Sequence, residues 1–509
     1  MSGTELPEDR PEKKPGEGGG RAPGTASSAR ETGPRAQEAG AERPASERVD
    51  GLPAEWTPRL RRIMNRITVA GCLAMVYLEL TSATPRTDLL LKLKASYQQF
   101  GIIEAIPPAM LLMQFVAGLL VHRLRARKPL WLALLLTQRL MAIPFALLPF
   151  VFRDLPTGIL VWCMIGCLAV AEGSANLGLP LWFSWMSDIL PHGSLGEFWA
   201  RRRRWLALSA TVTLGASAVL FKCFEQVDIR TMYLIVATVG ALAGVVDILL
   251  FIRIPEPRME QHPAPDWTLV FAPFRAPIFR RFIFFMAYWV FAATFGFAFF
   301  RLYMLKHLQM DIWTVQMIFA CHALGGVLFC AAIGRLTDKF GSRPVIVLSS
   351  FLKSFVVISL FVARPGFWGL VHLVPMFMLD NVLNTGFFVA HNNFMLKHSP
   401  RQHRVMYVAA LLATSGLLGA AASYCSGRCL QHFEYLELQP ERWLGLDWTN
   451  FHVIFAISIL LRWGAILVAL RIREPKSEGP GEVLFDTIVP AVVRLMSFPM
   501  GLFTREEER

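Results

Sequence analysis

Long runs of apolar residues, separated by short polar segments, follow one another along most of the chain from residue 66 to residue 470. A helix needs about 20 apolar residues to cross the hydrocarbon core of a bilayer. The runs that come close to this length lie at 66–84, 98–121, 129–151, 157–184, 205–224, 231–252, 280–304, 313–333, 344–363, 367–395, 405–427 and 450–470. The pattern predicts an all-α integral membrane protein with twelve transmembrane helices.

The polar connections alternate between cation-rich and cation-poor segments. The rich set includes HRLRARK at 122–128, RRRR at 201–204 and the segment 335–343, whereas the connections at 222–230 and 434–441 hold fewer cations. Because cations accumulate on the cytoplasmic side of membrane proteins, this alternation predicts that both termini are cytoplasmic. We expect the chain in the inner membrane of a bacterium.

Composition supports a membrane protein and explains the positive charge. Hydrophobic residues make up 54% of the 509 residues and charged residues 17%, against about 25% charged residues in soluble domains. The formal charge of +13 follows the cation-rich connections, so no nucleic-acid partner is expected. The eight cysteines form no C-x-x-C pair, and we expect neither a metal site nor a cofactor.

Segments of different composition divide the chain. Residues 1–58 hold too few large apolar side chains to fold, which predicts a disordered cytoplasmic tail. We expect six-helix halves at 59–254 and 279–474, joined by a Pro-rich cytoplasmic linker at 255–278. Residues 475–509 are predicted to form a second cytoplasmic tail, with an interfacial helix at 482–503.

The two predicted halves share three sequence features in the same order. These are segments 118–127 and 334–343, the motif Glu172-x-x-x-Asn176 and its counterpart Asp380-x-x-x-Asn384, and segments 253–257 and 471–475. The members of each pair lie 208–218 residues apart. The common order and spacing indicate an internal duplication of a six-helix unit.

The segment GRLTDKFGSRP at 334–344 resembles the signature loop of the major facilitator superfamily, Gly-x-x-x-Asp-(Arg/Lys)-x-Gly-x-(Arg/Lys). The plan of twelve helices in two pseudo-symmetric halves also resembles that superfamily. The resemblance implies that this loop latches the halves on the cytoplasmic side and releases them during alternating access. The residues that would carry this role are Gly334, Asp338, Lys339, Gly341 and Arg343, with Gly118 in the first-half copy.

The first-half copy of the loop departs from the superfamily pattern. His122 stands in place of the Asp, and Arg125 stands in place of the second Gly. Only the second loop, which has Asp338, is therefore expected to make the contact that the Asp of the signature loop makes in the superfamily. Its glycines are expected to permit a tight turn, because glycine adopts backbone conformations that other residues avoid. The alternative is that both loops are solvated basic turns.

Ionisable residues inside a membrane helix are costly unless they face a partner or a cavity. The candidates are Glu79, Glu104, Arg139, Glu172, Asp247, His322, Lys353, Asp380, His391 and Arg462. Each half has a cation midway along its third run and an acid in its fourth, which predicts one buried ion pair in each half. These pairs are Arg139–Glu172 and Lys353–Asp380.

The superfamily resemblance implies that the first, fourth, seventh and tenth helices line a central cavity. The residues that would line it are Glu79, Glu172, Asn176, Tyr288, Trp289, Asp380, Asn384 and His391. Glu79 has no cation in its own run, so it is the first candidate for coupling to a proton, with a permanent hydrogen bond as the alternative. The carboxylate–Asn pairs offer oxygen ligands for sodium instead, and each aromatic residue has ordinary packing as its alternative.

Several function classes lack their sequence patterns. No P-loop, H-E-x-x-H or G-x-S-x-G pattern occurs, so we expect neither ATP hydrolysis nor an enzyme. The segment 176–191 resembles the corresponding part of cation-coupled sugar symporters. We predict a secondary active transporter, a monomer among membrane lipids, that moves a small polar organic solute by alternating access.

The solute is expected to be sugar-like or an organic anion, and a proton or sodium gradient is expected to drive its transport. Two alternatives stay open. One is efflux of an amphipathic compound by the same fold, and the other is a membrane sensor or scaffold that has lost transport.

Overall fold

The computed structural model describes residues 48–49, 52–53, 58–121, 124, 126–190, 195–257, 271–400, 404–438, 441–443 and 446–471. Within these ranges some side chains are not described, among them all of those at 327–339. The predicted tail at 475–509 lies outside the described residues, as do most of the tail at 1–58 and residues 258–270 of the predicted linker.

Ten helical elements are described in the first half. They are α1 (Pro58–Thr81), α2 (Ala83–Lys92), α3 (Tyr97–Ala109), the 3-10 turn η1 (Met110–Leu112), α4 (Met113–Val121), α5 (Lys128–Leu140), α6 (Ala142–Val151), α7 (Thr157–Ile189), α8 (Leu195–Cys223) and α9 (Ile229–Ile252). The first of these begins at Pro58, within one residue of the predicted start of the half at 59.

The second half begins with a short helix inside the predicted linker. Its elements are α10 (Ala272–Arg275), α11 (Pro277–Phe297), α12 (Phe300–Leu302), the π-helix η4 (Tyr303–His307), α13 (Ile312–Phe340), α14 (Ser342–Ser359), η5 (Leu360–Val362), α15 (Phe367–His398), α16 (Arg404–His432), α17 (Tyr435–Leu438) and α18 (Asn450–Leu470). Two small antiparallel strand pairs are also described. They are β1 (Arg48–Val49) with β2 (Leu52–Pro53), and β3 (Glu441–Trp443) with β4 (Leu446–Trp448).

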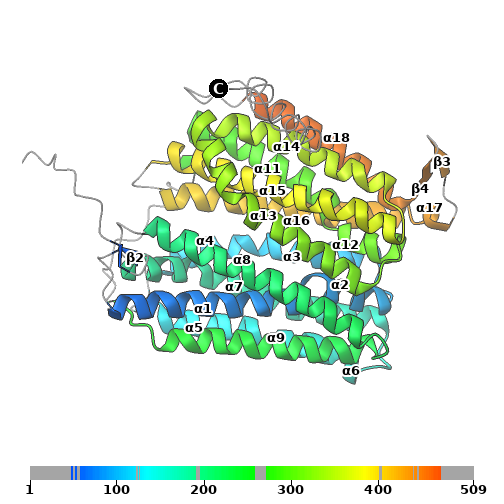
Figure 1. Ribbon diagram of the computed structural model, residues 1–509, viewed down its shortest axis with the longest axis horizontal. Helices are drawn as coiled ribbons and strands as arrows, with labels where there is room; N and C mark the ends of the chain where they lie inside the picture. The colour runs from blue at the N-terminus through cyan, green and yellow to red at the C-terminus, as the bar shows by residue number, and fades with distance from the viewer. Residues whose placement is uncertain are drawn as a thin grey trace, which may run out of the picture. The chain divides into compact units, whose positions relative to one another are not determined.

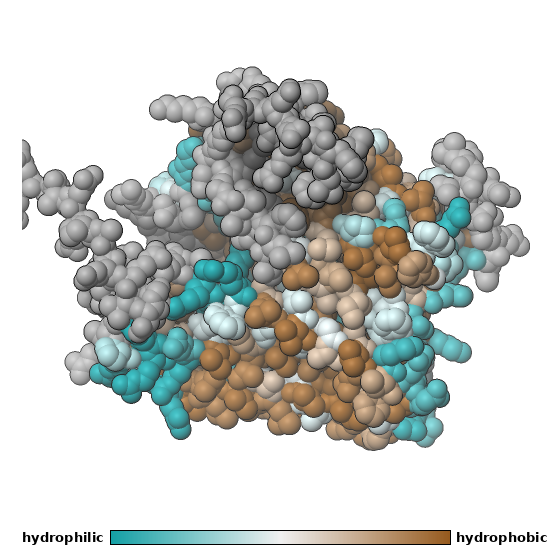
Figure 2. Space-filling model, in the orientation of Figure 1, coloured by the Kyte–Doolittle hydropathy of each residue, from teal (hydrophilic) through white to brown (hydrophobic). Residues whose placement is uncertain are grey.

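Eleven helical segments in the described part of the chain are long and apolar enough to cross a membrane. A twelfth, Ile312–Gly326, is the described apolar part of the 29-residue helix α13. Each of the twelve predicted runs corresponds to one of these segments, so the prediction of an all-α membrane protein is confirmed. Figure 2 shows apolar side chains in a broad band between polar margins, as expected for a surface in contact with lipid.

Three spans of the described first half are interrupted; a proline in the following turn explains two of the breaks, and two prolines lie directly before the third. Proline lacks the N–H that would bond to the carbonyl four residues earlier, so a helix bends or restarts in the preceding turn. Pro85 follows the break between α1 and α2, and Pro144 follows the break between α5 and α6. Pro107 and Pro108 lie just before η1, which separates α3 from α4.

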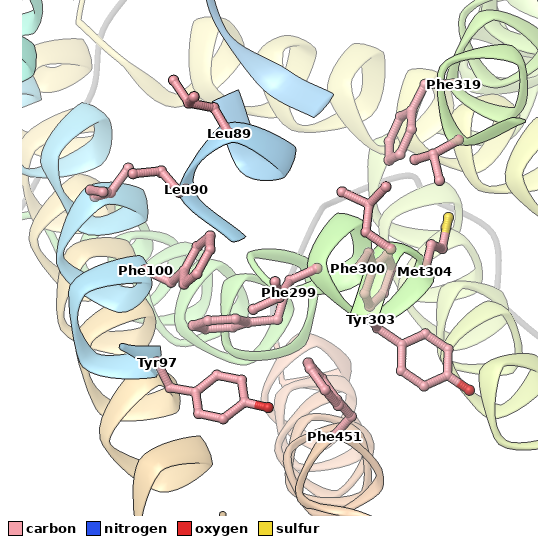
Figure 3. Packing of buried hydrophobic residues seen from close by; sticks show 14 of the residues in the cluster. Leu89, Leu90, Tyr97, Phe100, Phe299, Phe300, Tyr303, Met304, Phe319 and Phe451 are labelled. Atoms are coloured by element: carbon pink, nitrogen blue, oxygen red, sulfur yellow. The ribbon is translucent and has the colours of Figure 1, made fainter. Parts of the chain in front are cut away.

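We call the end of the bundle where α1 begins and α18 ends the proximal end, and the opposite end the distal end; they lie left and right in Figure 1. Helix α3 packs along α16, and α8 packs along α13, so both pairs join the two halves. At the distal end one apolar core draws residues from both halves, including Leu90, Phe100, Phe300 and Phe451 (Figure 3). The halves therefore share a core at this end.

The proximal end has a different core. A second apolar cluster, which includes Phe279, Phe282, Phe394 and Ala410, belongs to the second half. Among the described residues, Phe115 is the one side chain of the first half packed against it. The described part of the chain thus joins its halves at the distal end and keeps their cores apart at the proximal end.

The segment 334–344 was predicted to contain a loop, and its backbone differs from that prediction. Helix α13 continues through Gly334 to Phe340, and α14 begins at Ser342. The turn is made by Gly341 alone, whose φ of 91° is a conformation that favours glycine. The prediction of a tight turn is confirmed at Gly341 and is wrong at Gly334, which lies within α13.

Candidate functional site

The second half contains a buried polar cluster near the middle of its helices. Lys353 Nζ lies 3.1 Å from Asp380 Oδ1, and His322 Nε2 lies 3.4 Å from Asp380 Oδ2. Lys353 also donates a hydrogen bond of 3.3 Å to Asn384 Oδ1. The predicted Lys353–Asp380 ion pair is therefore present, and it joins α14 to α15.

Arg462 of α18 adds a second cation to this region. It is buried, and its guanidinium donates to the carbonyl oxygens of Lys353 and Ala293, each at 3.2 Å, and to Ser458 Oγ at 3.3 Å. Its charge also interacts with Asp380. The cluster therefore holds two cations for one carboxylate, and backbone carbonyls partly compensate the extra charge.

The first half contains an ion pair at the equivalent cation, but with a different partner. Arg139 Nη2 lies 2.9 Å from Asp247 Oδ2 of α9, so the predicted Arg139–Glu172 pair is wrong. The Arg139 guanidinium also lies over the ring of Tyr77, 4.2 Å from its centroid. Gly244, one turn before Asp247, leaves the space for this contact, because a Cβ there would overlap Arg139 Cδ.

Glu172 lies near the middle of α7 and lines a cavity of about 40 Å³ inside the first half. The cavity is also lined by polar groups of Tyr77, Thr81, Ser82, Arg86, Gln138 and Tyr233. Among the described residues, the Glu172 carboxylate makes no hydrogen bond or ion pair, although its backbone oxygen accepts a hydrogen bond from Asn176 Nδ2. This carboxylate therefore lines a cavity within one half that has both polar and apolar walls, the apolar ones including Leu78, Met141 and Phe145.

A third set of charged side chains lies towards the distal end. Arg86 Nη2 and Glu104 Oε1 form an ion pair of 3.0 Å, and the charge of Arg301 interacts with those of Glu79 and Glu104. The Arg301 guanidinium lies 4.0 Å from the centroid of the Phe319 ring. Since Arg301 belongs to α12 and both acids belong to the first half, this interaction crosses between the halves.

Sequence reasoning missed Arg86 and Arg301. Arg301 is the single cation of residues 282–304, beyond Arg280 and Arg281 at the start of the run, and this is a signal that could have identified it. Arg86 lies beyond the predicted end of the first run at residue 84, whereas the helical segment extends to Lys92. The charges at 86–94 obscured that extension.

The remaining predicted cavity residues have varied surroundings. Asn176 is buried and accepts a hydrogen bond of 3.1 Å from Gln114 Nε2. Trp289 packs against Phe387, with ring centroids 5.3 Å apart. The Phe387 carbonyl is in turn 3.0 Å from His391 Nδ1.

Tyr288 faces a helix of its own half. A Cβ at Gly464 of α18 would lie 2.6 Å from the Tyr288 hydroxyl oxygen, so this glycine makes room for the tyrosine. The predicted role of Tyr288 as a wall of the central cavity is not supported by this contact, whereas packing between helices explains it.

The predicted latch residues are described only in part. Arg343 Nη2 donates a hydrogen bond of 3.0 Å to the carbonyl oxygen of Leu470, which ties the start of α14 to the end of α18. The side chains of Asp338 and Lys339 lie outside the described residues, as does the surrounding of Gly118. The predicted contact of Asp338 stays a prediction.

The distal end is closed by polar contacts between the halves. Tyr97 of α3 donates to Glu437 Oε2 at 2.6 Å, and Lys306 donates to the Tyr97 hydroxyl at 2.8 Å. Lys306 and Glu437 form an ion pair of 3.0 Å. A cavity of about 340 Å³ adjoins these groups, lined by residues that include Lys94, Ser96 and Gln431.

Three solved structures of transporters resemble this arrangement of helices. The nucleoside transporter NupG is 13% identical, with 82% of this chain and 100% of that chain covered and a TM-score of 0.61. The D-xylose–proton symporter is 12% identical, with coverages of 82% and 98% and a TM-score of 0.62. A bacterial homologue of the human lysosomal transporter Spinster, inward-facing and occupied, is 13% identical, with coverages of 89% and 100% and a TM-score of 0.54.

A search of curated proteins found no match to this sequence. The family model of the Major Facilitator Superfamily matches residues 67–424 and 300–491. These matches cover most of the membrane-spanning part of the chain, and the similar structures have the same fold. The chain belongs to the major facilitator superfamily.

Proposed function

We propose that this protein is a secondary active transporter that moves a small polar organic solute across a membrane by alternating access, coupled to a proton or sodium gradient. The observation that carries the proposal is the placement of charged groups in both halves, near the middle of their helices. Charges at this depth are costly and are typical of solute and ion pathways. A protein with a purely structural role would be served as well by apolar contacts.

Alternating access requires that the two halves meet at one end of the bundle at a time. The shared apolar core and the Tyr97–Glu437–Lys306 contacts lie at the distal end, and the described cores are separate at the proximal end. We propose that both termini lie in the cytoplasm and that the membrane is the inner membrane of a bacterium. In this orientation the arrangement corresponds to a state closed to the outside.

The class of solute follows from the groups at mid-membrane. Asn176 and Asn384 offer amides, Trp289 offers an aromatic face, and these groups suit polar, sugar-like molecules. Lys353 and Arg301 suit a solute that carries a negative charge. The names of two structural neighbours, a nucleoside transporter and a sugar–proton symporter, agree with a polar solute.

The first experiment is thermal unfolding of the purified full chain against sugars, nucleosides, organic acids, amino acids and amphipathic cations. Each compound is added with and without sodium and at two pH values. A ligand that binds only the native state raises the free energy of unfolding by mass action, and Tm rises with it. At a ligand concentration 100 times the Kd, the gain is about 2.7 kcal/mol. A polar solute is expected to raise Tm, and the shift is expected to depend on pH or sodium.

Two outcomes contradict the proposal. Stabilisation by amphipathic cations alone would favour efflux of such compounds. A flat panel, together with activity that disappears on deletion of residues 1–55 and 480–509, would favour a sensor or scaffold. Asp380→Asn serves as the binding control, because it removes the carboxylate that holds Lys353 and His322.

A further inference from the structure

The acids of the first half are unequally supplied with cations. Arg139 is paired with Asp247 at 2.9 Å, and Arg86 is paired with Glu104 at 3.0 Å. The charges of both arginines reach Glu172, but each has its direct contact elsewhere. Glu172 therefore receives only the residual attraction of cations that other carboxylates already bind.

Glu79, like Glu172, makes no direct ion pair among the described residues. The charge of Arg301 interacts with Glu79, and no direct ion pair of Arg301 with another acid is found among the described residues. Sequence reasoning favoured Glu79 for ion coupling because its own span has no cation. The geometric difference between the two acids is the cavity, because Glu172 lines it and Glu79 does not.

The cavity beside Glu172 provides the second argument. Its volume of about 40 Å³ exceeds the roughly 10–15 Å³ that one water molecule needs. Its polar lining offers several hydrogen-bonding groups to such water. A carboxylate that lines such a cavity can receive a proton through water without opening the surrounding helices.

The internal repeat supplies a comparison within the same molecule. Asp380 occupies the position in the second half that Glu172 occupies in the first. Asp380 directly contacts Lys353 and His322, and the charge of Arg462 reaches it as well. The two equivalent acids thus have opposite surroundings, since one has a surplus of cations and the other has no direct partner among the described residues.

We propose that Glu172 takes up and releases the coupling ion of the transport cycle, and that this ion is a proton. The inference rests on the proposed transport function and deepens it. Uptake adds one proton from water to a carboxylate oxygen and removes one negative charge from the first half. Release returns that proton to water.

Sodium fits this cavity less well. A sodium ion needs several oxygen ligands, whereas much of the lining is apolar and includes Leu78, Met141 and Phe145. The side-chain oxygen of Gln138 accepts a hydrogen bond from Arg139. The guanidinium of Arg86 lines the same cavity and would repel a second cation.

Other charged or titratable groups face Glu172 from the neighbouring helices. They are Tyr77 of α1, Arg86 of α2, Glu104 of α3, Arg139 of α5 and Tyr233 of α9, and Cys167 of α7 itself lines the same cavity. Substitution of any of them would also change the proton affinity of Glu172. The decisive variant is therefore Glu172→Gln, which keeps the shape of the side chain and removes its proton site.

The test is infrared difference spectroscopy of the purified full chain between acidic and neutral pH, with no solute present. Wild type is expected to show the C=O band of a protonated carboxyl group, and Glu172→Gln is expected to lose it. The matched variants Asp380→Asn and Glu79→Gln are expected to keep it. If Glu172→Gln does not fold, Glu172→Asp keeps a carboxyl group and is expected to shift the band.

Loss of the band in Glu79→Gln or Asp380→Asn with retention in Glu172→Gln overturns the inference. Absence of the band in wild type, or no shift in Glu172→Asp, overturns it as well. None of these results depends on whether a solute is found, so they do not decide the transport function.

A transport measurement distinguishes the proposed role of Glu172 from the proposed transport function. In proteoliposomes, Glu172→Gln is expected to lose accumulation driven by a pH gradient and to keep solute exchange at equilibrium. Accumulation equal to that of wild type, or accumulation driven only by sodium, overturns the role of Glu172 and leaves the protein a transporter. Failure of the wild-type chain to move any solute contradicts the proposed function itself.

Discussion

Helices α3 and α16 of the two halves make a close backbone contact at Gly101 and Gly427, and it can be tested with one methyl group. A Cβ at Gly101 would lie 2.8 Å from the carbonyl oxygen of Ser423 and 2.9 Å from the Cα of Gly427. A Cβ at Gly427 would lie 2.8 Å from the carbonyl oxygen of Tyr97. Since these neighbours are backbone atoms, no side-chain rotation relieves the overlap, and Gly101→Ala must push the helices apart.

The magnitude follows from the cost of overpacking, which is about 1–3 kcal/mol for an inserted methyl group. A cost of about 2 kcal/mol changes an equilibrium by roughly 25-fold, because 1.4 kcal/mol corresponds to a factor of ten. The contact exists only while the halves meet at the distal end. The cost therefore falls on this arrangement and shifts the population towards one in which the distal end is open.

The assay is a distance distribution between spin labels on the two halves, placed at the exposed positions Lys94 and Tyr435. The eight cysteines are replaced first, so that only the introduced labels react. Gly101→Ala is expected to add a population at longer distance. The control is Gly166→Ala in α7, where a Cβ would meet nothing within 4 Å.

Both substitutions gain helix propensity of about 1 kcal/mol, so the control isolates the effect of the contact. A distribution unchanged from wild type in Gly101→Ala and in the larger Gly101→Val, with the protein still folded, would refute the reasoning. It would mean that the two helices absorb the added volume without separation of the halves.

Three other substitutions test the polar contacts. Lys353→Met leaves Asp380 with His322 and Arg462 as cationic neighbours, so the expected loss of stability is smaller than the about 3–5 kcal/mol of a buried charge left without a partner. Thermal unfolding measures this loss, and a Tm equal to that of wild type would show that the Lys353–Asp380 pair does not stabilise the fold. Tyr97→Phe removes the hydroxyl that donates a hydrogen bond to Glu437, at a cost of about 1 kcal/mol. It is expected to increase the population with the distal end open in the spin-label assay, and an unchanged distance distribution would show that this hydroxyl does not hold the halves together. Asp338→Asn is expected to slow transport and leave solute binding intact; a transport rate equal to that of wild type would make the segment a passive connection.

The local features of this protein could be predicted because the bilayer imposes them segment by segment. Each run of about 20 apolar residues must satisfy its own backbone as a helix, and all twelve runs correspond to described segments. The turn at Gly341 was predictable for a similar reason, since a positive φ there requires glycine. The Lys353–Asp380 pair followed from the rule that a buried charge needs a partner.

The same rule failed for Arg139, and the failure is instructive. Glu172 and Asp247 both lie within the spans of the first half, and sequence alone does not say which of them α5 faces. The rotation of α9 and the absence of a side chain at Gly244 bring Asp247 to 2.9 Å from Arg139. Glu172 is left facing a cavity as a result.

The sequence by itself determined the helices, their duplication and the residues that carry charge into the membrane, because length, hydropathy and spacing are properties of one segment at a time. Only the tertiary structure decided which charges meet, which acid lines a cavity and where the halves touch. These outcomes depend on the rotation and separation of helices far apart in the chain. A shift of one helix by a few ångströms exchanges one ion pair for another, because the attraction between charges falls with distance while the cost of burying them remains.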